Sequence, residues 1–496
     1  MDSINLDDFP EIPKGSLLNY NNHYDLYQVY KGTTRVDPKT GKTKRSRITI
    51  GSIKNGVFTF SKTYLLNQEK QALIEKLKAV EKGERQIKQK RTKEIKTQVD
   101  QVNDKVNEAL KASSFDTRNP LRIEIPMQTI AMGTLMSALT GATDCEEISD
   151  AIENSYNNFW NKYCPSLKVK QISHDTVRNT MMLVRNEAFD EFYMRLTTPL
   201  VRCLKDRIVS ADGQACRATA LTDKENEELH GTRMLMNIYD KTNRVVLSHK
   251  LIDKKTNEIS VGPGMIKQLN LEGAVVTADA MSCQVTFIDS VMSSGAHYCL
   301  SLKGNQDKSL EEVRYLFNVT NKDQMLELEQ KPILEHGRIE ERKISVIRGK
   351  LLSRELKNKW SGLSGGSIVK IESKRTQKTT DKTSTEDRYY ITSLEPKEEN
   401  LERILEVIRE HWGIENNLHW VLDMRFNQDR MQANNPLYIA NRSALNKLAL
   451  AMLENYRFWL WDHKRDSKPQ SIKIMQQRCR VPEVAIECLA CGLGLL

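Results

Sequence analysis

Two short stretches, "RIVSAD" (207–212) and "AVVTAD" (274–279), indicate how this chain folds. Each reads as a buried strand that ends on an aspartate, Asp212 in the first and Asp279 in the second. A buried carboxylate without a partner would take up a proton, and a bound divalent cation is one way to keep it ionised. Either aspartate alone could simply cap the turn or helix that follows it. Their repetition in neighbouring strands favours a shared role.

The segments around these strands follow the order of a ribonuclease H-like sheet, with three meandering strands, a helix, and then strand, helix, strand. "RMLMNIY" and "RVVLSHKLI" form the predicted hairpin across "DKTN", "VGPGMIKQLN" is the helix, and "HYCLSLK" (297–303) is the last strand. A strand-rich insertion then occupies about 306–396, with "GSIVKIESK" and "DRYYITSL" paired across a loop at 375–386. A helix over about 400–423 and an apolar helix over 437–457 complete the core.

The stretch "HWGIENNLHW" (411–420) supplies a candidate for a third acid. At helical spacing, one face of the predicted helix carries four polar side chains, namely His411, Glu415, His419 and Asp423. Magnesium prefers oxygen ligands, and two such ions can hold both oxygens of an in-line phosphoryl displacement. Glu415 is therefore the candidate to join the two strand aspartates.

Zinc is the rival on the same face, because two histidines and a glutamate can bind it. His411 and His419, however, stand eight residues apart, about 12 Å of helix rise, which is too far for one ion. Trp412 and Trp420 have two open interpretations: they belong to the core, or they stack on a displaced base at the cleavage end.

The positive charge of the chain is concentrated near its N-terminus. Residues 31–96 hold 19 Lys and Arg against 6 Asp and Glu, whereas the whole chain has a formal net charge of +10. Residues 24–66 alternate like a small antiparallel sheet, and a long polar helix follows over about 68–112. Nucleic acid is the expected partner, although solvated charge without a partner is the alternative. The hairpin tip carries Lys39, Lys42, Lys44 and Arg45. The basic residues expected on DNA are Lys42, Lys44 and Arg45 at this tip and Lys88 and Arg91 on the helix.

The long helix and the segment after it show helical patterns. A short heptad-like seam fits either a coiled coil or packing against a neighbouring domain, and it consists of Ile95, Val99, Val102, Val106 and Leu110. Residues about 120–205 read as all-helical, with Asp144 and Glu147 in capping-box positions. "SHDTVRN" (173–179) resembles part of a helix-turn-helix and would place Arg178 on DNA, with an ordinary helical hairpin as the alternative.

Length, composition and cysteine usage narrow the class of protein. A chain of 496 residues exceeds one hydrophobic core, so two to four domains are expected. No stretch approaches the ~18 apolar residues of a membrane span, and the acidic start lacks the apolar region of a secretory signal. The nine scattered cysteines suit a reducing compartment. Cys488 and Cys491 read as two thiols near a frayed end rather than a zinc site. We expect a cytoplasmic, nucleoid-associated protein without a membrane partner.

The expected organisation is multidomain α/β, and it divides the chain into six segments. They are a basic sheet and long helix for DNA binding (1–112), a helical domain with the helix-turn-helix candidate (113–205), the first part of the ribonuclease H-like core (206–305), the β-rich insertion (306–396), the second part of the core with the glutamate-bearing helix (397–460), and a basic C-terminal tail (461–496).

Several ordered motifs resemble one family. They are "SHDTVRN", "DKKTNEI", "VVTADAMSCQ", "HYCLSLKGNQ", "HGRIEERKISV", "STEDRYYITSL" and "REHWGIENNLHWVLDMRF". Over about 120–457 the chain is similar to the ISAs-type, or H-repeat-associated, insertion-sequence transposases of the DDE superfamily. That resemblance implies a ribonuclease H-like core interrupted by a β-rich insertion. It also implies cleavage of phosphodiesters at element ends and joining of 3′-hydroxyls to target DNA.

The resemblance also assigns residues and partners. Asp212, Asp279 and Glu415 would be the catalytic acids and would hold Mg²⁺, for which Mn²⁺ substitutes. The residues implied to lie near DNA are Lys303, Asn305, Arg409, His411, Asn416 and His419. The DNA would be the terminal repeats and the target, bound by a homodimer or a higher oligomer.

Two departures from the family motifs keep other functions open. Where the family has I-D-G-K-x-x-R-G, this chain has Gln214 for Lys and Ala218 for the last Gly, and Gln428 replaces the Glu of F-x-E-D. These changes would fit a catalytically inactive or domesticated DNA-binding protein, which cleavage of element ends distinguishes from a live enzyme. A structure-selective nuclease of the same fold is the third class, and strand-transfer products would exclude it.

Overall fold

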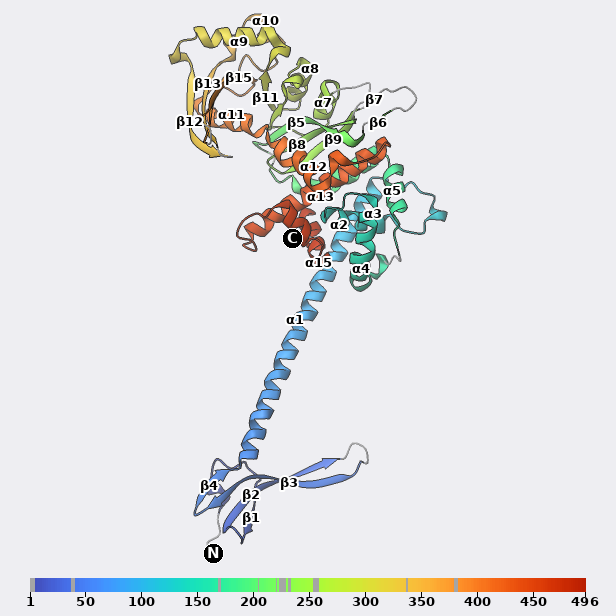
Figure 1. Cartoon of the computed structure of the whole chain (residues 1–496), viewed down its shortest axis with the longest axis vertical. Coiled ribbons are helices and arrows are strands. Elements are labelled where there is room, and N and C mark those ends of the chain that lie inside the picture. Colours follow the sequence, from blue (N-terminus) through green and yellow to red (C-terminus); the bar gives the residue numbers. More distant parts are fainter. Residues whose placement is uncertain are drawn as a thin grey trace. The chain divides into compact units, whose positions relative to one another are not determined.

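The computed structural model describes residues 5–36, 41–167, 171–203, 205–219, 221–222, 229–230, 233–252, 258–335, 338–378 and 382–496. The chain forms two compact units, Met1–Glu94 and Ile95–Leu496. Figure 1 shows both and labels many of their helices and strands.

A four-stranded antiparallel sheet makes up most of the first unit. Its strands follow one another in space as in sequence, and they are β1 (Leu17–Asn21), β2 (Leu26–Val36), β3 (Thr43–Lys54) and β4 (Val57–Phe60). A β-bulge at Ile50, where Val29 pairs with Gly51 and Tyr30 with Thr49, allows Val29, Ile50 and Ile53 all to be buried. β2 and β3 stay paired out to Val36 and Thr43. This is the hairpin that the sequence predicts, and Lys42 and Arg45 are exposed on it. Lys39 and the side chain of Lys44 lie outside the described residues.

Helix α1 (Lys62–Ala112) begins after this sheet and ends in the second unit. Lys88 and Arg91 are exposed on it. Further along, Val99, Val102 and Val106 are fully buried and belong to the main hydrophobic cluster of the second unit. Of the two interpretations of the seam, packing against a neighbouring domain is therefore the one that the structure shows.

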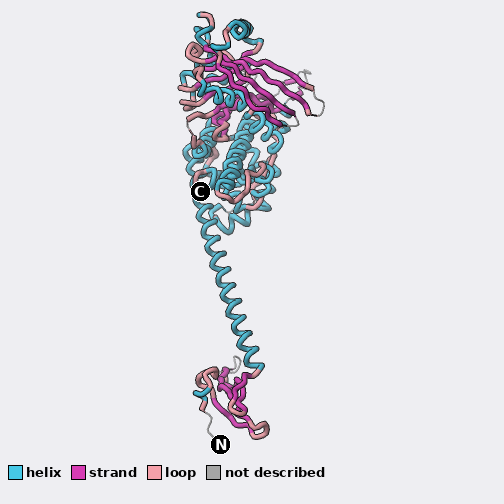
Figure 2. Tube along the Cα trace, turned by 90° about the vertical axis from the view of Figure 1, so that its left-hand side faces the viewer, coloured by secondary structure: helices cyan, strands magenta, loops and turns pink. Residues whose placement is uncertain are grey.

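The helical part of the second unit surrounds α13 (Pro436–Asp462), the apolar helix predicted at 437–457. The helices of this part are α2 (Met127–Leu139), α3 (Cys145–Ala151), α4 (Asn157–Tyr163), α5 (His174–Leu183), α6 (Asn186–Thr197), α14 (Ile472–Arg478) and α15 (Pro482–Gly492). α3 begins with the predicted capping pattern, because the Asp144 carboxylate accepts from the Glu147 N–H at 2.8 Å. In Figure 2 these cyan helices gather beside the magenta strands of the same unit.

The end of the chain differs from the frayed segment that the sequence suggests. Cys488 and Cys491 are buried on α15, which packs with α13 in the main hydrophobic cluster. Most residues of this short helix are apolar and buried, and burying them stabilises an ordered helix.

A mixed sheet of nine strands forms the rest of the second unit, in the order β12-β13-β14-β15-β11-β10-β5-β8-β9 (Figure 1). The central strands are β5 (Ile208–Cys216), β8 (Arg233–Asp240), β9 (Val245–Ile252), β10 (Val275–Ala278) and β11 (His297–Leu302). β5, β10 and β11 are parallel, whereas β5, β8 and β9 form an antiparallel meander. The mixed α/β class and the predicted order of these elements are confirmed. A short pair, β6 (Leu221–Thr222) and β7 (Leu229–His230), lies between β5 and β8 in sequence.

The strands of the predicted insertion extend this central sheet. They are β12 (Leu326–Glu335), β13 (Arg338–Arg348), β14 (Ser367–Gln377) and β15 (Thr383–Thr392), with α9 (Asp307–Val319) before them and α10 (Arg354–Lys359) between β13 and β14 in sequence. β15 pairs antiparallel with β11, from Cys299↔Thr392 to Leu302↔Tyr389. β14 and β15 pair as predicted, but they run further than the sequence suggests, so the expected loop at 375–386 is wrong in extent. Backbone pairing continues there through polar residues whose types are typical of a loop.

Helices cover both faces of the central strands. α7 (Glu258–Lys267) and α8 (Val285–Ser293) bury Met265, Ile266 and Phe287 on one face. α11 (Glu398–Glu410) buries Leu401 and Ile404 on the other. This arrangement brings the segment after α11 to the ends of β5 and β10.

The predicted helix over 400–423 is not continuous. α11 ends at Glu410, a π-helical turn η11 spans Glu415–His419, and α12 (Trp420–Phe426) follows. Gly413, a poor helix former, stands at the interruption. A π turn accommodates one extra residue, and such turns occur often at functional sites. The prediction of one straight helix is therefore wrong in its middle.

Candidate active site

The two strand aspartates lie at neighbouring positions of the sheet. β5 and β10 pair in parallel from Ile208↔Val275 to Ala211↔Ala278, so Asp212 and Asp279 are the next residues of each strand. β10 ends at Ala278, as predicted, but β5 continues to Cys216 because β8 still pairs with it. Asp212 thus stands where β5 loses one of its two neighbours, and not at the end of the strand.

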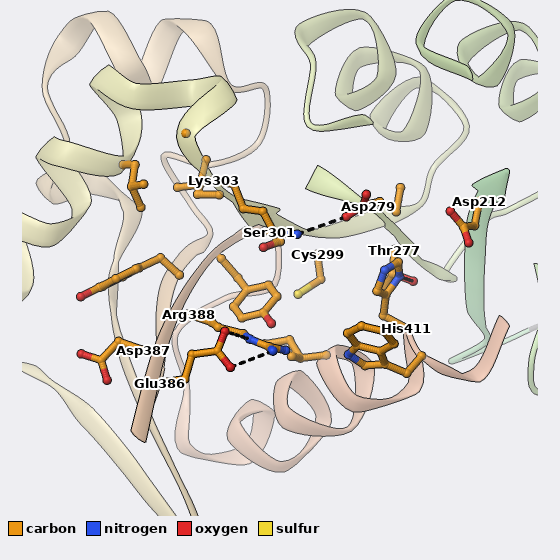
Figure 3. A pocket seen from close by; sticks show the side chains of 18 of the residues that line it. Asp212, Thr277, Asp279, Cys299, Ser301, Lys303, Glu386, Asp387, Arg388 and His411 are labelled. Carbon is orange, nitrogen blue, oxygen red and sulfur yellow. Dashed lines mark hydrogen bonds and ion pairs between the residues drawn. The ribbon is translucent and has the colours of Figure 1, made fainter. Parts of the chain in front are cut away.

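Both aspartates line a cleft of about 600 Å³ that also includes Glu415, His411 and Lys303 (Figure 3). One oxygen of Asp279 accepts from the Ala280 N–H at 2.7 Å, and the same oxygen lies 3.6 Å from Lys303 Nζ. The three acids therefore reach one cleft from three separate segments of the chain.

His419 links two of these acids. Its Nδ1 lies 3.3 Å from Glu415 Oε2 and 3.6 Å from Asp212 Oδ2, and its ring is buried. On the other side of the ring, the Asn237 amide nitrogen lies 3.2 Å from Nε2. With that amide donating, Nε2 accepts and Nδ1 carries the hydrogen, which faces the two carboxylates.

The surroundings shift the pKa values of Asp212 and Glu415 in opposite directions. Burial raises the pKa of Asp212 to about 6, with the nearby Glu258 and Asp279 charges adding to the rise and His419 opposing it. The hydrogen bond from His419 lowers the pKa of Glu415. A positive partner would therefore favour the ionised form of Asp212 at neutral pH.

Glu258 is a fourth acid that sequence reasoning did not assign. It begins α7, and burial, followed by the charge of Asp279, raises its pKa. A Cβ on Gly213 would stand 1.9 Å from Glu258 Oε1, so only glycine leaves this carboxylate in place. The sequence did contain a signal for Glu258, because this residue lies in the motif "DKKTNEI" (253–259) that resembles the family, but the motif alone assigned no role to it.

The other polar residues of the 411–423 face also contact the sheet. His411 Nδ1 lies 3.3 Å from Thr277 Oγ1, and burial lowers the pKa of this histidine. Asp423 Oδ1 accepts from Gln214 Nε2 at 2.9 Å. The prediction that the four residues share one side is confirmed, although the helix is interrupted. The zinc pair of His411 and His419 is not formed, because each ring contacts a different strand.

The remaining residues predicted to contact DNA fall into two groups. Near the acids, Asn305 Nδ2 donates to the Ala280 carbonyl at 2.7 Å and so holds the turn after Asp279, while Arg409, Trp412 and Asn416 are exposed. Arg178 does not line the acid cleft; it is exposed on α5 and pairs with Asp175 at 3.2 Å. Lys42, Arg45, Lys88 and Arg91 belong to the first unit. Trp412 and Trp420 are 55% and 52% exposed, so neither is a core residue.

The two departures from the family motifs contact each other. Gln428 Nε2 donates to Gln214 Oε1 at 2.7 Å, and both side chains are buried. Gln428 Oε1 in turn accepts from Ser443 Oγ at 3.2 Å. The pair joins β5, two residues beyond Asp212, to the turn that follows α12.

Residues 204–452, about half of the chain, match the family described as Transposase DDE domain. The chain belongs to this family of DDE transposases. It is 26% identical over 383 residues to "Putative transposase YncI" of Escherichia coli O157:H7, covering 76% of this chain and 93% of that protein. It is 24% identical over 353 residues to "H repeat-associated putative transposase YhhI" of Escherichia coli strain K12, covering 68% and 88%. A third relative, "H repeat-associated putative transposase YbfD" of the same strain, is 24% identical over 236 residues, covering 47% and 89%. The resemblance to H-repeat-associated transposases is confirmed.

Membership of this family implies an enzyme that needs a divalent metal and acts on DNA. The residues present fit such an ion. One ligand atom each from Asp212, Glu415 and His419 lie within 4.8 Å of one another, and Asp279 faces the same cleft. Carboxylate oxygens suit Mg²⁺ and Mn²⁺, whereas His419 Nδ1, which carries its hydrogen, faces these carboxylates as a donor. Among the described residues, no helix is long and apolar enough to cross a membrane.

Proposed function

We propose that this chain is an active insertion-sequence transposase that cleaves phosphodiesters at the ends of its element and joins the freed 3′-hydroxyls to target DNA. The observation that carries the proposal is the convergence of Asp212, Asp279 and Glu415 on one cleft from β5, the end of β10 and η11. The strand order β9-β8-β5-β10-β11, with β8 antiparallel to β5, supports a ribonuclease H-like core for this chemistry.

The proposed metal ligands are these three carboxylates, with Mg²⁺ as the ion and Mn²⁺ as a substitute. Two such ions, when bound, activate the attacking oxygen and stabilise charge on the leaving oxygen. The chain orients two of the ligand carboxylates through hydrogen bonds, His419 to Glu415 and the Ala280 N–H to Asp279, while His419 Nδ1 also lies 3.6 Å from Asp212. These contacts restrain the ligand oxygens without a bound substrate.

The other contribution of the protein is to position the reacting phosphate and oxygens. In cleavage, water adds to the scissile phosphorus and the 3′-oxygen leaves; in joining, that 3′-hydroxyl adds to a target phosphorus and another oxygen leaves. Each step exchanges one P–O bond for another, so orientation and charge stabilisation supply most of the rate. Lys303, 3.6 Å from Asp279, is placed to contact a phosphate beside the acids.

The proposed DNA comprises the terminal repeats of the element and the target, met by the chain in the cytoplasm at the nucleoid. Binding to the repeats is assigned to the first unit through Lys42, Lys44, Arg45, Lys88 and Arg91, and to Arg178 of α5. Near the acids it is assigned to Lys303, Asn305, Arg409, His411, Trp412, Asn416 and His419. A homodimer or higher oligomer would hold the two element ends together.

The hydrogen bond between Gln214 and Gln428 bears on the inactive alternative. A defect at one of these buried positions would leave the other side chain without a partner, at a cost of about 1–3 kcal/mol. Instead Gln428 Nε2 donates to Gln214 Oε1, while Gln214 Nε2 donates to Asp423 and Gln428 Oε1 accepts from Ser443. This fully bonded pair supports a functional site.

The test uses purified full-length protein and a supercoiled plasmid that carries the DNA flanking its own gene, with Mg²⁺, Mn²⁺ or EDTA. Glu415→Gln and Asp279→Asn are the inactive variants, and Glu402→Gln, an exposed carboxylate on α11, is the matched control. We expect metal-dependent cuts at fixed flanking positions and strand-transfer products from the wild type and the control only.

Other outcomes would overturn the proposal in different ways. Binding of the flanks without cutting would favour a DNA-binding protein with an inactive core. Cuts without any strand-transfer product would favour the nuclease. Loss of both binding and cutting in Asp279→Asn would assign that residue a structural role.

A further inference from the structure

A second cleft, of about 620 Å³, lies beside the acid cleft and is strongly basic. One face of the strands β13, β14 and β15 forms one wall, and the segment from the end of α11 into η11 forms the other. Six of its lining side chains are cations, namely Lys241, Arg338, Arg342, Arg375, Arg388 and Arg409, and two are carboxylates, Glu340 and Glu410. These eight residues define what is called here the arginine cleft.

The carboxylates of the arginine cleft do not neutralise it. Glu410 pairs with Lys241 at 2.8 Å. Glu340, only 5% exposed, contacts Arg338 at 2.7 Å, Arg375 at 3.8 Å and also Arg342. Six cations against these two carboxylates and Glu386, which pairs with Arg388, leave an excess of three positive charges in one hollow. Such a concentration raises the local density of anions.

The two faces of the same sheet differ in their balance of positive and negative side chains. Because side chains alternate along a strand, Arg338, Arg342 and Arg375 point to the cleft, whereas Lys343 and Lys374 point to the opposite face. On that opposite face each lysine has an acidic partner: Lys343 lies 2.8 Å from Glu327, and Lys374 lies 3.3 Å from Glu341. An ordinary solvated sheet would not show an excess on one face only.

Donors in the arginine cleft remain available to a ligand. Arg375 Nε is buried 3.8 Å from Glu340 and makes no hydrogen bond among the described residues, so Arg375 contributes its charge to the cleft but not this donor. Arg409 is exposed, and within the described chain its guanidinium makes neither a hydrogen bond nor an ion pair. Guanidinium groups match phosphate geometry, so an anion that enters the cleft finds unused donors.

The arginine cleft and the acid cleft adjoin each other. Arg388 and Trp412 line both. Figure 3 shows Arg388 at the near wall of the acid cleft, where its guanidinium is bound by Glu386 at 2.8 Å. A chain of phosphates can therefore run from the acids past Trp412 into the arginine cleft.

We propose that the arginine cleft binds the phosphodiester backbone of the DNA strand that continues from the scissile phosphate, with Trp412 between the two clefts. The identification of the polyanion as DNA rests on the proposed function. The cleft itself is new, because Arg338, Arg342, Arg375 and Arg388 were not expected to contact DNA from the sequence.

The test measures DNA binding in the Glu415→Gln background, so that cutting does not interfere. A fluorescent duplex carrying the flanking DNA is titrated with Arg375→Gln, Arg409→Ala and the double variant at several salt concentrations. Lys374→Gln is the matched control, since it removes one charge from the neighbouring residue on the opposite face of β14. Thermal unfolding of each variant verifies that the fold is kept, and Glu340 retains two arginines in Arg375→Gln.

We expect each arginine variant to weaken binding about 3- to 10-fold and to reduce the slope of log Kd against log salt by about 1, while the control binds as the parent does. Binding equal to that of the control in both single variants and the double would overturn the inference. Tighter, arginine-dependent binding of an RNA duplex of the same sequence would overturn the choice of DNA. Cleavage by the wild-type protein is scored separately, so a protein that binds in this way without cutting refutes the proposed function and not the cleft.

Discussion

Replacing Gln214 by Lys and Gln428 by Glu, one at a time and together, tests whether the two glutamines act as a matched pair. In the wild type, Gln214 Nε2 donates to Asp423 Oδ1 at 2.9 Å, and Gln214 Oε1 accepts from Gln428 Nε2 at 2.7 Å. Gln428→Glu alone removes this donor and places a carboxylate at a fully buried position facing an acceptor. An uncompensated buried charge costs about 3–5 kcal/mol.

Gln214→Lys alone is expected to be less harmful. The new ammonium group can pair with Asp423, whose carboxylate already accepts from this position. It cannot accept from Gln428 Nε2, however, and an orphaned buried donor costs about 1–3 kcal/mol. In the double variant the introduced ammonium group can donate both to the introduced carboxylate and to Asp423. The cost of the double variant should therefore fall below the sum of the single costs by about 2 kcal/mol or more.

Intrinsic tryptophan fluorescence during urea unfolding is a suitable assay, because all six tryptophans lie within Ile95–Leu496. The signal therefore reports the unit that contains both glutamines. Cleavage of the flanking-DNA plasmid is measured in parallel, and the double variant should recover activity that Gln428→Glu loses. Additive stability losses, or single variants as stable as the wild type, would refute the view that the pair connects β5 to the turn after α12.

Three further predictions concern single side chains. Burial, and next the charge of Asp429, raises the pKa of Asp423 to about 6, so the folded protein holds this proton more tightly than the unfolded chain does, and the associated stability is lost as pH rises through about 6. Asp423→Asn keeps the hydrogen-bond acceptor without the charge, so it should raise Tm at pH 8 but not at pH 4.5. An equal gain at both pH values would contradict this prediction. Gly213→Ala would displace the Glu258 carboxylate, so plasmid cleavage should fall about tenfold while Tm changes little. A large fall in Tm together with the loss of cleavage would instead indicate a folding defect. Val102→Ala should destabilise the second unit by about 1–3 kcal/mol in urea unfolding, whereas Val80→Ala, at a position 59% exposed on the same helix, should have no measurable effect.

Local pattern predicted much of the fold and part of the site. Alternation and apolar runs located β5, β10 and the meander, because burial on a sheet leaves a period that the sequence displays. Asp212 and Asp279 followed from the same pattern, since a charge at the end of an apolar run is conspicuous. Spacing alone also placed His411, Glu415, His419 and Asp423 on one side of their segment, and each has a partner on the sheet or in the cleft.

Glu258 and the arginine cleft could not be found in that way. Glu258 reaches the acids only because Gly213 allows α7 to approach β5, and a close approach between segments leaves no periodic signal. The four arginines are spread over β13, β14 and β15 at positions that look like ordinary polar strand residues. Their common face depends on the register between strands, which pairing in three dimensions decides.

Residue types at short spacing were enough to predict the class of the elements, their order and the three candidate acids, and the resemblance of several longer motifs indicated the family. Three features emerged only from the folded chain: β5 continues past Asp212, the insertion joins the central sheet through β15 and β11, and the helix before Glu415 is interrupted. The same cause underlies all three. Backbone hydrogen bonds and packing between segments distant in sequence outweigh the local preference of each segment.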